Sequence, residues 1–313
     1  FKQKTAYEIM PSLVGSEMCI RDSLYGQITQ EKEIFADSNL GAVSIHPGGV
    51  GRNIAENLGH LGAEVDFIGH FGGDEFAKML KCSLENAGVS VNFSYSNTNK
   101  KSDFYLAIHD KQGELISAVN DMGLVESLPT SFLNEDDRIQ AIYNAQFIIL
   151  DGNLSDDLLT KIFYSFGDNS IIAVDTVSSM KAQRFIPYLS KINLIKCNRA
   201  EANILISAEE HLSLQQISEK LMYSGIGTAI VSDSFDGFIV STKTKFNLFK
   251  SKKFESSNSS GAGDALFSGF LYAICKGKTS FEAAEFGISL VEKTLEISGP
   301  VNPEVSELGK TLR

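Results

Sequence analysis

The residues best suited to do chemistry are a run of small residues followed at once by an acid, within residues 258–267 (NSSGAGDALF). Gly261, Ala262 and Gly263 are small enough for their backbone N–H groups to surround an anion, and the helix expected next points its positive end there. Asp264 would place a carboxylate beside that anion, where it could accept a proton. Phosphoryl transfer to a hydroxyl requires such a cradle and base. The alternative is a glycine-rich turn with Asp264 as an ordinary first-turn acid.

A second cluster, residues 48–58 (GGVGRNIAENL), precedes another expected helix. Gly48 and Gly49 would let the backbone approach a ligand closely. Asn53 offers both a donor and an acceptor, which suits sugar hydroxyls. The alternative is a tight strand-to-helix turn with Asn53 as the helix cap.

A third cluster, residues 196–201 (KCNRAE), follows an expected strand and opens a helix. Open α/β sheets bind ligands at such strand ends. Asn198 and Glu201 are three residues apart, so both can face one crevice, and their oxygens suit a hydrated Mg²⁺. The alternative is a capping box, in which Asn198 caps the helix and Glu201 reaches back.

Two common nucleotide motifs are absent. Tyr272 stands where the leading glycine of GxxxxGK[ST] would precede Gly277-Lys278-Thr279, and Ile54 stands where GxGxxG requires its third glycine. The sequence therefore disfavours a P-loop NTPase and a dinucleotide dehydrogenase.

Strand and helix patterns alternate from about Leu24 onward, which predicts an α/β fold with a doubly wound, mostly parallel sheet flanked by helices. Segments 103–109 and 114–120 alternate across a turn instead, and with the extended segment 37–46 they predict a small sheet outside the main layer. The expected strands are 63–69, 146–150, 171–174, 192–197 and 229–232, and the expected helices are 74–87, 156–166, 214–223 and 281–295.

Composition narrows the class of protein. The chain has 313 residues, 43% of them hydrophobic, and a net charge of −11 with a pI near 5.0, which argues against nucleic acid or an anionic membrane as the main partner. No apolar run approaches the roughly 20 residues that span a bilayer. The four cysteines are scattered, without metal-ligand spacing, and indicate reduced thiols in the cytoplasm.

Residues 1–23 show neither strand alternation nor a helical face, and they resemble translated sequencing-adapter sequence joined to a gene fragment. We therefore expect this segment to lie outside the fold and the true N-terminus to be missing. The remaining residues, 24–313, are expected to form one domain.

Together GGVGRNIAENLGHLG, NRAE and SSGAGDALFSGF resemble, in order and separation, the signatures of the ribokinase-like (PfkB) sugar and nucleoside kinases. The resemblance covers roughly residues 37–305. Segments 37–39 (DSN) and 118–122 (AVNDM) resemble the pseudouridine kinases within that family most closely. The resemblance implies a ribokinase-like fold with a β-lid from about 34–47 and 92–121, which in this family often pairs with a second subunit.

The resemblance also assigns roles. It implies that Asp264 is the base that deprotonates a substrate 5′-hydroxyl, with the turn before it as the anion hole. It implies that Asn198 and Glu201 organise Mg²⁺ and the ATP phosphates through water. The substrate residues would be Gly48, Gly49 and Asn53, with Asn120 and Asp121 at the return of the lid; Ser232, Gly237, Asn198 and Gly263 would contact ATP.

Three departures from the family pattern concern the site. Segment 24–32 contains no Asp, whereas the first strand of the family carries one that holds the sugar hydroxyls. Ser234 and Phe235 stand where the nucleotide loop has glycines, and Asn258 stands where many relatives have an Asp that supports a K⁺ site.

The expected function is therefore Mg-ATP-dependent phosphorylation of the 5′-hydroxyl of pseudouridine. One alternative is a kinase for another ribonucleoside or for a free sugar such as ribose. The other is a nucleoside-binding relative that no longer catalyses, although such a protein would not need the intact GAGD.

Overall fold

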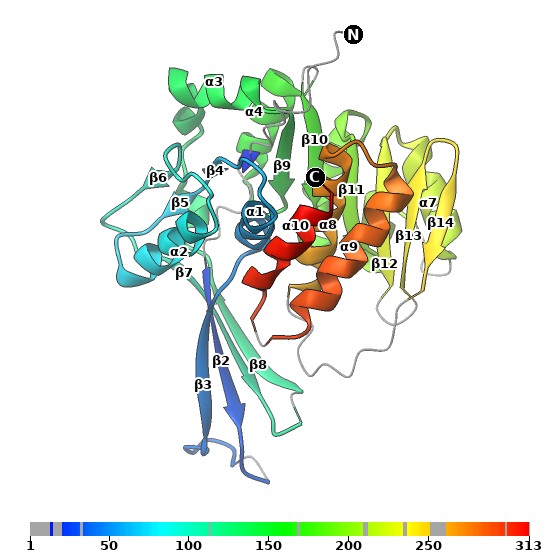
Figure 1. Cartoon of the computed structure of the whole chain (residues 1–313). Coiled ribbons are helices and arrows are strands. Elements are labelled where there is room, and N and C mark those ends of the chain that lie inside the picture. The colour runs from blue at the N-terminus through cyan, green and yellow to red at the C-terminus, as the bar shows by residue number, and fades with distance from the viewer. Residues whose placement is uncertain are drawn as a thin grey trace.

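A mixed six-stranded sheet forms the centre of the computed structural model, which describes residues 13–14, 21–31, 34–112, 114–167, 170–208, 212–233, 237–250, 261–297 and 299–312. Its strand order is β14-β13-β12-β11-β10-β9 (Figure 1). Strands β9 to β12 are parallel, whereas β13 and β14 are antiparallel to their neighbours. The bounds are β9 Phe147–Asp151, β10 Ile171–Asp175, β11 Leu194–Asn198, β12 Thr228–Asp233, β13 Gly237–Thr242 and β14 Phe246–Phe249.

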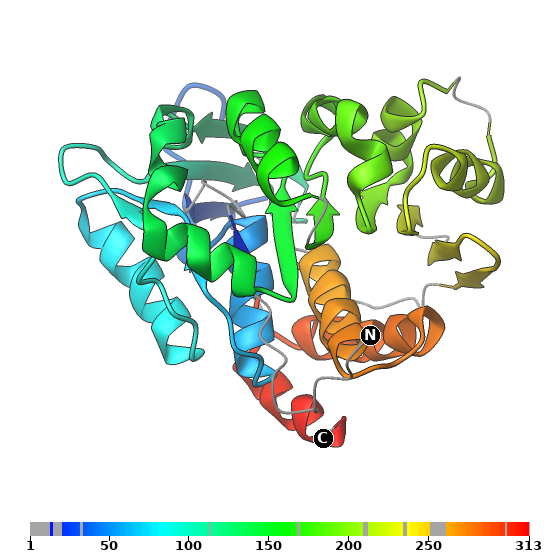
Figure 2. The ribbon, with the colours of Figure 1, turned by 90° about the horizontal axis from the view of Figure 1, so that it is seen from above.

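Helices cover both faces of this sheet because its strands are apolar on both sides (Figure 2). Along β9, Phe147 and Ile149 belong to one core, and Ile148 and Leu150 belong to the other. The first core includes residues of α1 Val50–His60, α2 Glu75–Asn86, α8 Ala262–Cys275, α9 Ser280–Thr294 and α10 Ser306–Thr311. The second includes residues of α3 Asp136–Asn144, α4 Asp156–Phe166, α5 Ser179–Ala182, α6 Arg199–Leu205 and α7 Leu214–Tyr223. The doubly wound arrangement is thus confirmed.

A second sheet projects from this body (Figure 1) and has the order β3-β2-β7-β8. Its strands are β2 Arg21–Ile28, β3 Gly41–Pro47, β7 Asp103–His109 and β8 Leu115–Asp121. The small sheet outside the main layer is therefore confirmed, with the hairpin β7–β8 at its edge. The predicted lid segments omitted β2, which lies in its centre. We call this sheet the lid.

Capping explains why the helix after Gly73 begins where it does. The Asp74 side chain accepts a hydrogen bond from the N–H of Ala77 at 3.0 Å, so the predicted cap is confirmed. Its other oxygen accepts from the N–H of Ser102 at 2.7 Å, next to the first residue of β7. One carboxylate thus joins α2 to the base of the lid.

Short elements complete the described chain. Within the strand predicted over 63–69, only the short strand β4 Phe67–Ile68 forms. Strand β5 His70–Phe71 follows it and pairs with β6 Tyr95–Ser96. The 3₁₀ helices are η1 Val125–Ser127, η2 Thr130–Asn134, η3 Gln183–Lys191 and η5 Pro303–Val305. No helix in the described ranges is long and apolar enough to cross a membrane.

The expectation that residues 1–23 lie outside the fold is wrong for the part of that segment that the structure describes. Leu13–Val14 forms β1, which pairs in parallel with the buried strand β4. Strand β2 begins at Arg21, and Ser23 is buried. Leu13–Val14 could not be recognised from the sequence, because two apolar residues are too few to show a period. Arg21 to Ser23 extend the alternating strand that follows, because β3 and β7 provide backbone hydrogen-bond partners on both sides.

Deleting residues 1–23 should therefore lower Tm. The deletion removes β1 from β4 and the first three residues from β2, which exposes backbone groups and the apolar surface of Phe67 and Ile68. A loss of about 1 kcal/mol or more corresponds to a Tm lower by about 1.5 °C or more for a chain of this size. Thermal unfolding of the deletion should be compared with deletion of residues 1–12 alone. Equal Tm values for the full chain and both deletions would contradict the packing of this segment.

Candidate active site

The N-terminus of α8 carries the small-residue turn. Gly261 has φ 81°, and a Cβ there would overlap the carbonyl oxygen of Pro300, so this position requires glycine. A Cβ on Gly263 would lie 2.8 Å from Nζ of Lys196. The lysine ammonium and the first N–H groups of α8 therefore converge on one place, which suits an anion.

Asp264 lies in the first turn of α8 with only 7% of its surface exposed. Its Oδ2 accepts a hydrogen bond from Nδ2 of Asn53 at 2.7 Å. Burial raises the pKa of Asp264 to about 6, although the positive charge of Lys196 and the bond from Asn53 act in the opposite direction. A carboxyl with this pKa is a stronger base than an exposed aspartate and is still ionised at pH 7.

Arg52 fixes the orientation of Asn53. Its buried guanidinium donates from Nε to the carbonyl of Gly48 at 2.7 Å, and it also donates to Oδ1 of Asn53 and to Glu56. Because the amide oxygen of Asn53 faces Arg52, its amino group faces Asp264. The interpretation of Asn53 as a helix cap is wrong, since α1 is capped by Gly49 (φ 105°) without a side-chain bond.

Charged residues lie at the carboxyl ends of the neighbouring strands β10 and β11. Nζ of Lys196 donates to Oδ2 of the fully buried Asp175 at 2.9 Å, and Oδ1 of Asp175 accepts from the N–H of Val177 at 3.0 Å. Burial acts to lower the pKa of Lys196, but Asp175, Asp264 and Glu201 together raise it above its usual value. The ammonium beside Gly263 is therefore charged.

Asp151 is the last residue of β9, and it is in register with Asp175, the last residue of β10. Its Oδ1 accepts from the N–H of Asn153 at 2.8 Å, whereas its Oδ2 has no partner among the residues that the structure describes. Burial raises the pKa of Asp151 to about 7, despite the bonds from Asn153 and the charge of Lys181. Asp151, Asp175 and Lys196 were not among the residues predicted from the sequence, although polar residues at the carboxyl ends of buried parallel strands are a usable signal.

Asn198 and Glu201 form the capping box that was the alternative interpretation. The N–H of Glu201 donates to Oδ1 of Asn198 at 2.9 Å, and the N–H of Asn198 donates to Oε2 of Glu201 at 2.8 Å. Oε2 also accepts from Thr176 Oγ1 at 2.7 Å, and Oε1 accepts from Nδ2 of Asn198 at 2.7 Å. Glu201 is thus held rigidly at the carboxyl end of the sheet.

Mg²⁺ prefers six oxygen ligands, and the oxygens of Asn198 and Glu201 are the ones available here. Both oxygens of Glu201 already accept hydrogen bonds, and no group of three or more His, Cys, Asp or Glu side chains in the described ranges could hold a metal. The residues therefore do not fit a cation held by protein alone. They fit a hydrated Mg²⁺ that is carried by substrate phosphates, since such ions keep several waters.

The predicted ATP residues Ser232 and Gly237 lie at the ends of β12 and β13, with Ser232 in register with Asn198 of β11. The structure therefore places Ser232 beside the capping box. Ser234, Phe235 and Asn258 lie outside the described residues.

The lid residues divide between two faces. Asn120 is in register with Tyr105, and Asp121 is in register with Phe104. Successive side chains of a strand point to opposite faces. Asn120 therefore shares a face with His46, which lies against Gly299, whereas Asp121 shares the other face. The face of Asp121 includes Phe104, whose ring packs against Phe76 of α2 with centroids 4.7 Å apart.

Comparisons with known proteins agree with this fold. The family model of the pfkB carbohydrate kinases matches residues 24–304. The chain is 28% identical over 275 residues to the pseudouridine kinase of Escherichia coli, covering 87% of each chain, and 24% identical over 273 residues to the guanosine-inosine kinase of Exiguobacterium acetylicum, covering 82% of this chain and 86% of that one. The ribokinase of Arabidopsis thaliana, solved with ribose and ATP, superimposes with a TM-score of 0.81 at 18% identity, over 97% of this chain and 99% of that one.

The α/β body and the β-lid together make this a protein of the ribokinase-like fold class. The chain belongs to the pfkB family of carbohydrate kinases, so it is a phosphotransferase that acts on a hydroxyl of a sugar or nucleoside and uses ATP.

Proposed function

We propose that this kinase phosphorylates the 5′-hydroxyl of pseudouridine. The observation that carries the proposed chemistry is the buried Asp264 carboxylate, held by Asn53 and placed beside the ammonium of Lys196 at the start of α8. The similarity to the Escherichia coli pseudouridine kinase supports the substrate.

In the proposed reaction Asp264 accepts the proton of the 5′-hydroxyl as the hydroxyl oxygen bonds to the γ-phosphorus and the bond from phosphorus to the ADP oxygen breaks. Charge on the transferring phosphoryl group is stabilised by the backbone N–H groups of Gly261, Ala262 and Gly263 and by Lys196. Mg²⁺ bound with ATP would neutralise part of the phosphate charge, with Glu201 and Asn198 holding its waters and Ser232 and Gly237 near the nucleotide.

Substrate binding would use the turn at Gly48 and Gly49, the Asn53 amide and Asn120 of the lid. The face of the lid that includes Asp121 carries exposed apolar side chains that are neighbours in register: Val43, Ile45, Leu106, Ile108 and Val119. A patch of this kind favours a protein contact, so we propose that two copies pair through their lids.

The substrate assignment is tested by a panel of pseudouridine, uridine, guanosine, inosine and ribose at fixed ATP. Pseudouridine should give the highest kcat/KM. A higher value for another nucleoside or for ribose would replace the substrate while retaining the kinase. ATP binding without turnover of any of these compounds would favour a non-catalytic nucleoside-binding protein.

The pH dependence of the rate should reflect Asp264. Protonated Asp264 cannot accept a proton, so kcat/KM should fall as pH decreases through about 6, the raised pKa of this carboxyl, rather than through about 4. Initial rates between pH 5 and pH 8, with coupling enzymes in excess, measure this limb. A rate that is flat down to pH 5 would contradict the assignment of the base.

Glu201→Gln should raise the Mg²⁺ concentration that gives half-maximal rate, with KM for the nucleoside little changed. Since the amide nitrogen of Gln cannot accept the bonds from Asn198 and Thr176, some loss of Tm is expected as well. Ser213 and Gln216 form a capping box on α7, and Gln216→Ala serves as the control for cap loss alone. Lower Tm with unchanged Mg²⁺ dependence would restrict Glu201 to its capping role.

A further inference from the structure

Arg52 of α1 is a charged side chain that the fold buries almost completely, with 1% of its surface exposed. Its ion-pair partner is Glu56, one helical turn further on, whose Oε1 accepts a hydrogen bond from Ser83 Oγ of α2 at 2.8 Å. Removing such a pair from water costs about as much free energy as the attraction returns, so a buried pair adds little net stability. The pair therefore indicates a function other than holding the fold together.

The guanidinium of Arg52 is fixed by two backbone carbonyls. Its Nε donates to the carbonyl of Gly48 at 2.7 Å, and its Nη2 donates to that of Pro47, the last residue of β3, at 2.9 Å. A guanidinium is planar and its N–H groups point in fixed directions, so these two bonds set the plane and position of the whole group. Nη2 also donates to Oδ1 of Asn53. The donor that reaches Asn53 is thus held in place.

This neighbour allows the Asn53 amide only one orientation. Arginine donates and cannot accept, so the amide oxygen of Asn53 faces Arg52. The amino group then faces the other way and donates from Nδ2 to Oδ2 of Asp264 at 2.7 Å. With the amide turned over, its oxygen would face the Asp264 carboxylate, and two acceptors would oppose each other. Arg52 thus determines which atom of Asn53 faces Asp264.

We propose that Arg52 is a positioning residue for the kinase reaction, which holds the Asn53 amide in the orientation that donates to Asp264. This inference rests on the proposed function, in which Asp264 is the base. A hydrogen bond donated to a carboxylate stabilises its ionised form, and only the ionised form can accept a proton. Arg52 acts on the base through Asn53.

The groups around Asp264 set the direction of the expected effect. Those that act on it from neighbouring elements are Lys196 of β11, Asp175 of β10, and Asn53 and Arg52 of α1. Burial is the largest influence and raises the pKa of Asp264 to about 6; Asp175 acts in the same direction, and the other three groups lower the pKa. Helix α9 also packs on α8, where Gly287 approaches Gly269 and adds no charge. Losing the bond from Asn53 therefore raises the pKa further.

Arg52→Lys keeps the positive charge and removes the planar arrangement of donors. The Asn53 amide can then turn over, so the midpoint of the Asp264 titration should rise from about 6 by about one pH unit or more, the scale of one hydrogen bond to a charged group. ¹³C NMR of the full chain with labelled aspartate measures this midpoint, with the signal assigned through Asp264→Asn. The acidic limb of kcat/KM should move with it. An unmoved midpoint would overturn the proposal.

Two comparisons separate positioning from other effects. Arg138 of α3 is also buried and donates to a backbone carbonyl, from Nε to Phe93 at 2.7 Å, so Arg138→Lys is the matched control and should leave the Asp264 midpoint unchanged. In an Asn53→Ala background, Arg52→Lys should add little, because the amide through which it acts is missing. An equal rise in Arg138→Lys, or an undiminished rise in the Asn53→Ala background, would overturn the proposal.

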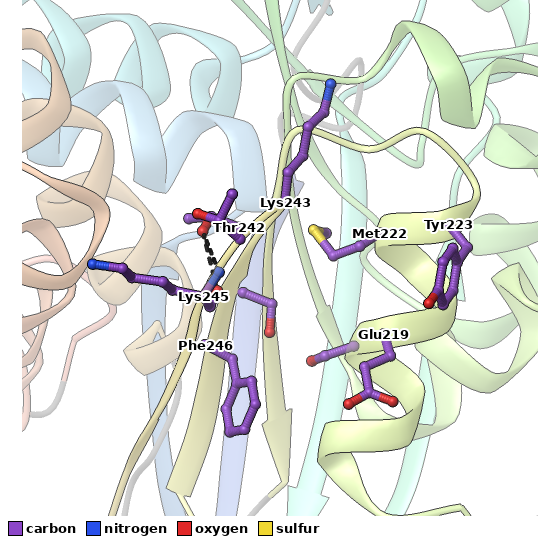
Figure 3. Close-up of a pocket in the computed structure, with 10 residues that line it drawn as sticks. Glu219, Met222, Tyr223, Thr242, Lys243, Lys245 and Phe246 are labelled. Carbon is purple, nitrogen blue, oxygen red and sulfur yellow. Dashed lines mark hydrogen bonds between the residues drawn. The ribbon is translucent and has the colours of Figure 1, made fainter.

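A remote methionine checks the fold of each variant. Met222 lines a groove of about 360 Å³ between α7 and the turn that joins β13 to β14 (Figure 3). Thr242 of this groove is in register with Thr228, the first residue of β12, whereas Ser232 near the other end of β12 is in register with Asn198 of the candidate active site. The groove thus lies at the opposite end of the sheet, and the ¹³C-methyl signal of Met222 should keep its position in Arg52→Lys.

If Arg52→Lys moves the Met222 signal or does not fold, Arg52→Met/Glu56→Gln decides. This variant removes both charges of the pair, which is close to neutral for stability and leaves the net charge unchanged. The Asn53 amide again loses its fixed donor, so the Asp264 midpoint should rise as in Arg52→Lys. The same midpoint as in the unmodified chain would overturn the proposal.

The titration is measured without turnover, so it distinguishes this inference from the proposed function. A raised Asp264 midpoint with an unmoved acidic limb of kcat/KM would support the positioning of Asn53 by Arg52 and contradict only the assignment of Asp264 as the base. An unmoved midpoint in Arg52→Lys, together with a large loss of kcat in Asp264→Asn, would retain the base and overturn the role of Arg52.

Discussion

Asp264→Asn should lower kcat by about 10² or more while the affinity for ATP stays similar. Asn keeps the shape of the side chain and removes its basicity, and general-base catalysis contributes on this scale. The substitution should not lower Tm, because burial disfavours the charged carboxylate and the neutral amide avoids that cost. Steady-state kinetics with ATP binding by calorimetry measure both quantities.

The matched control is Asp157→Asn, which changes another first-turn acid, on α4, that is exposed and remote in sequence. Its kcat should equal that of the unmodified chain. If Asp264→Asn retains more than about a tenth of kcat, well short of a general-base effect, Asp264 is not the base. An equal loss in both variants would point to an unspecific effect of removing a helix-terminal charge.

Most of the fold could be predicted from local patterns in the sequence. Asp74 specifies the start of its helix because its side chain can reach the N–H three residues on, and no distant partner is needed. The strand predicted over 146–150, which is β9 in the structure, could be recognised as a short apolar run because its residues pack between two layers of helices. Leu13–Val14 was missed because its pairing depends on β4, more than fifty residues away, and two residues cannot show a period.

The candidate site was likewise predictable only where its residues lie close together in the sequence. Gly261 and Asp264 were selected from the sequence because one segment contains both the turn and the acid. The contact between Asp264 and Asn53 joins positions 211 residues apart, and the amide orientation depends on the buried Arg52. Glu201 could not be assigned from its spacing, since a capping box and a metal-organising pair place the same residues three apart.

Lys196 is the residue whose role follows from the structure alone, and Lys196→Met should lower kcat by about 10² to 10³, the range for losing one preorganised donor at a developing charge. The substitution also leaves Asp175 buried without its ion-pair partner. Breaking a buried pair costs about 3 kcal/mol or more, which corresponds to roughly 5 °C of Tm or more in a chain of this size. A loss of activity in this variant alone would therefore be ambiguous.

The double variant Lys196→Met/Asp175→Asn removes that ambiguity. Replacing both members of a buried pair by neutral groups is close to neutral for stability, so Tm should recover most of what Lys196→Met loses. The ammonium beside Gly263 is still missing, so kcat should remain low. Asp175→Asn alone keeps the ammonium and should lose less activity than either variant that lacks Lys196. If kcat recovers together with Tm in the double variant, Lys196 serves only to pair with Asp175, and the phosphoryl group is stabilised by the N-terminus of α8 without it.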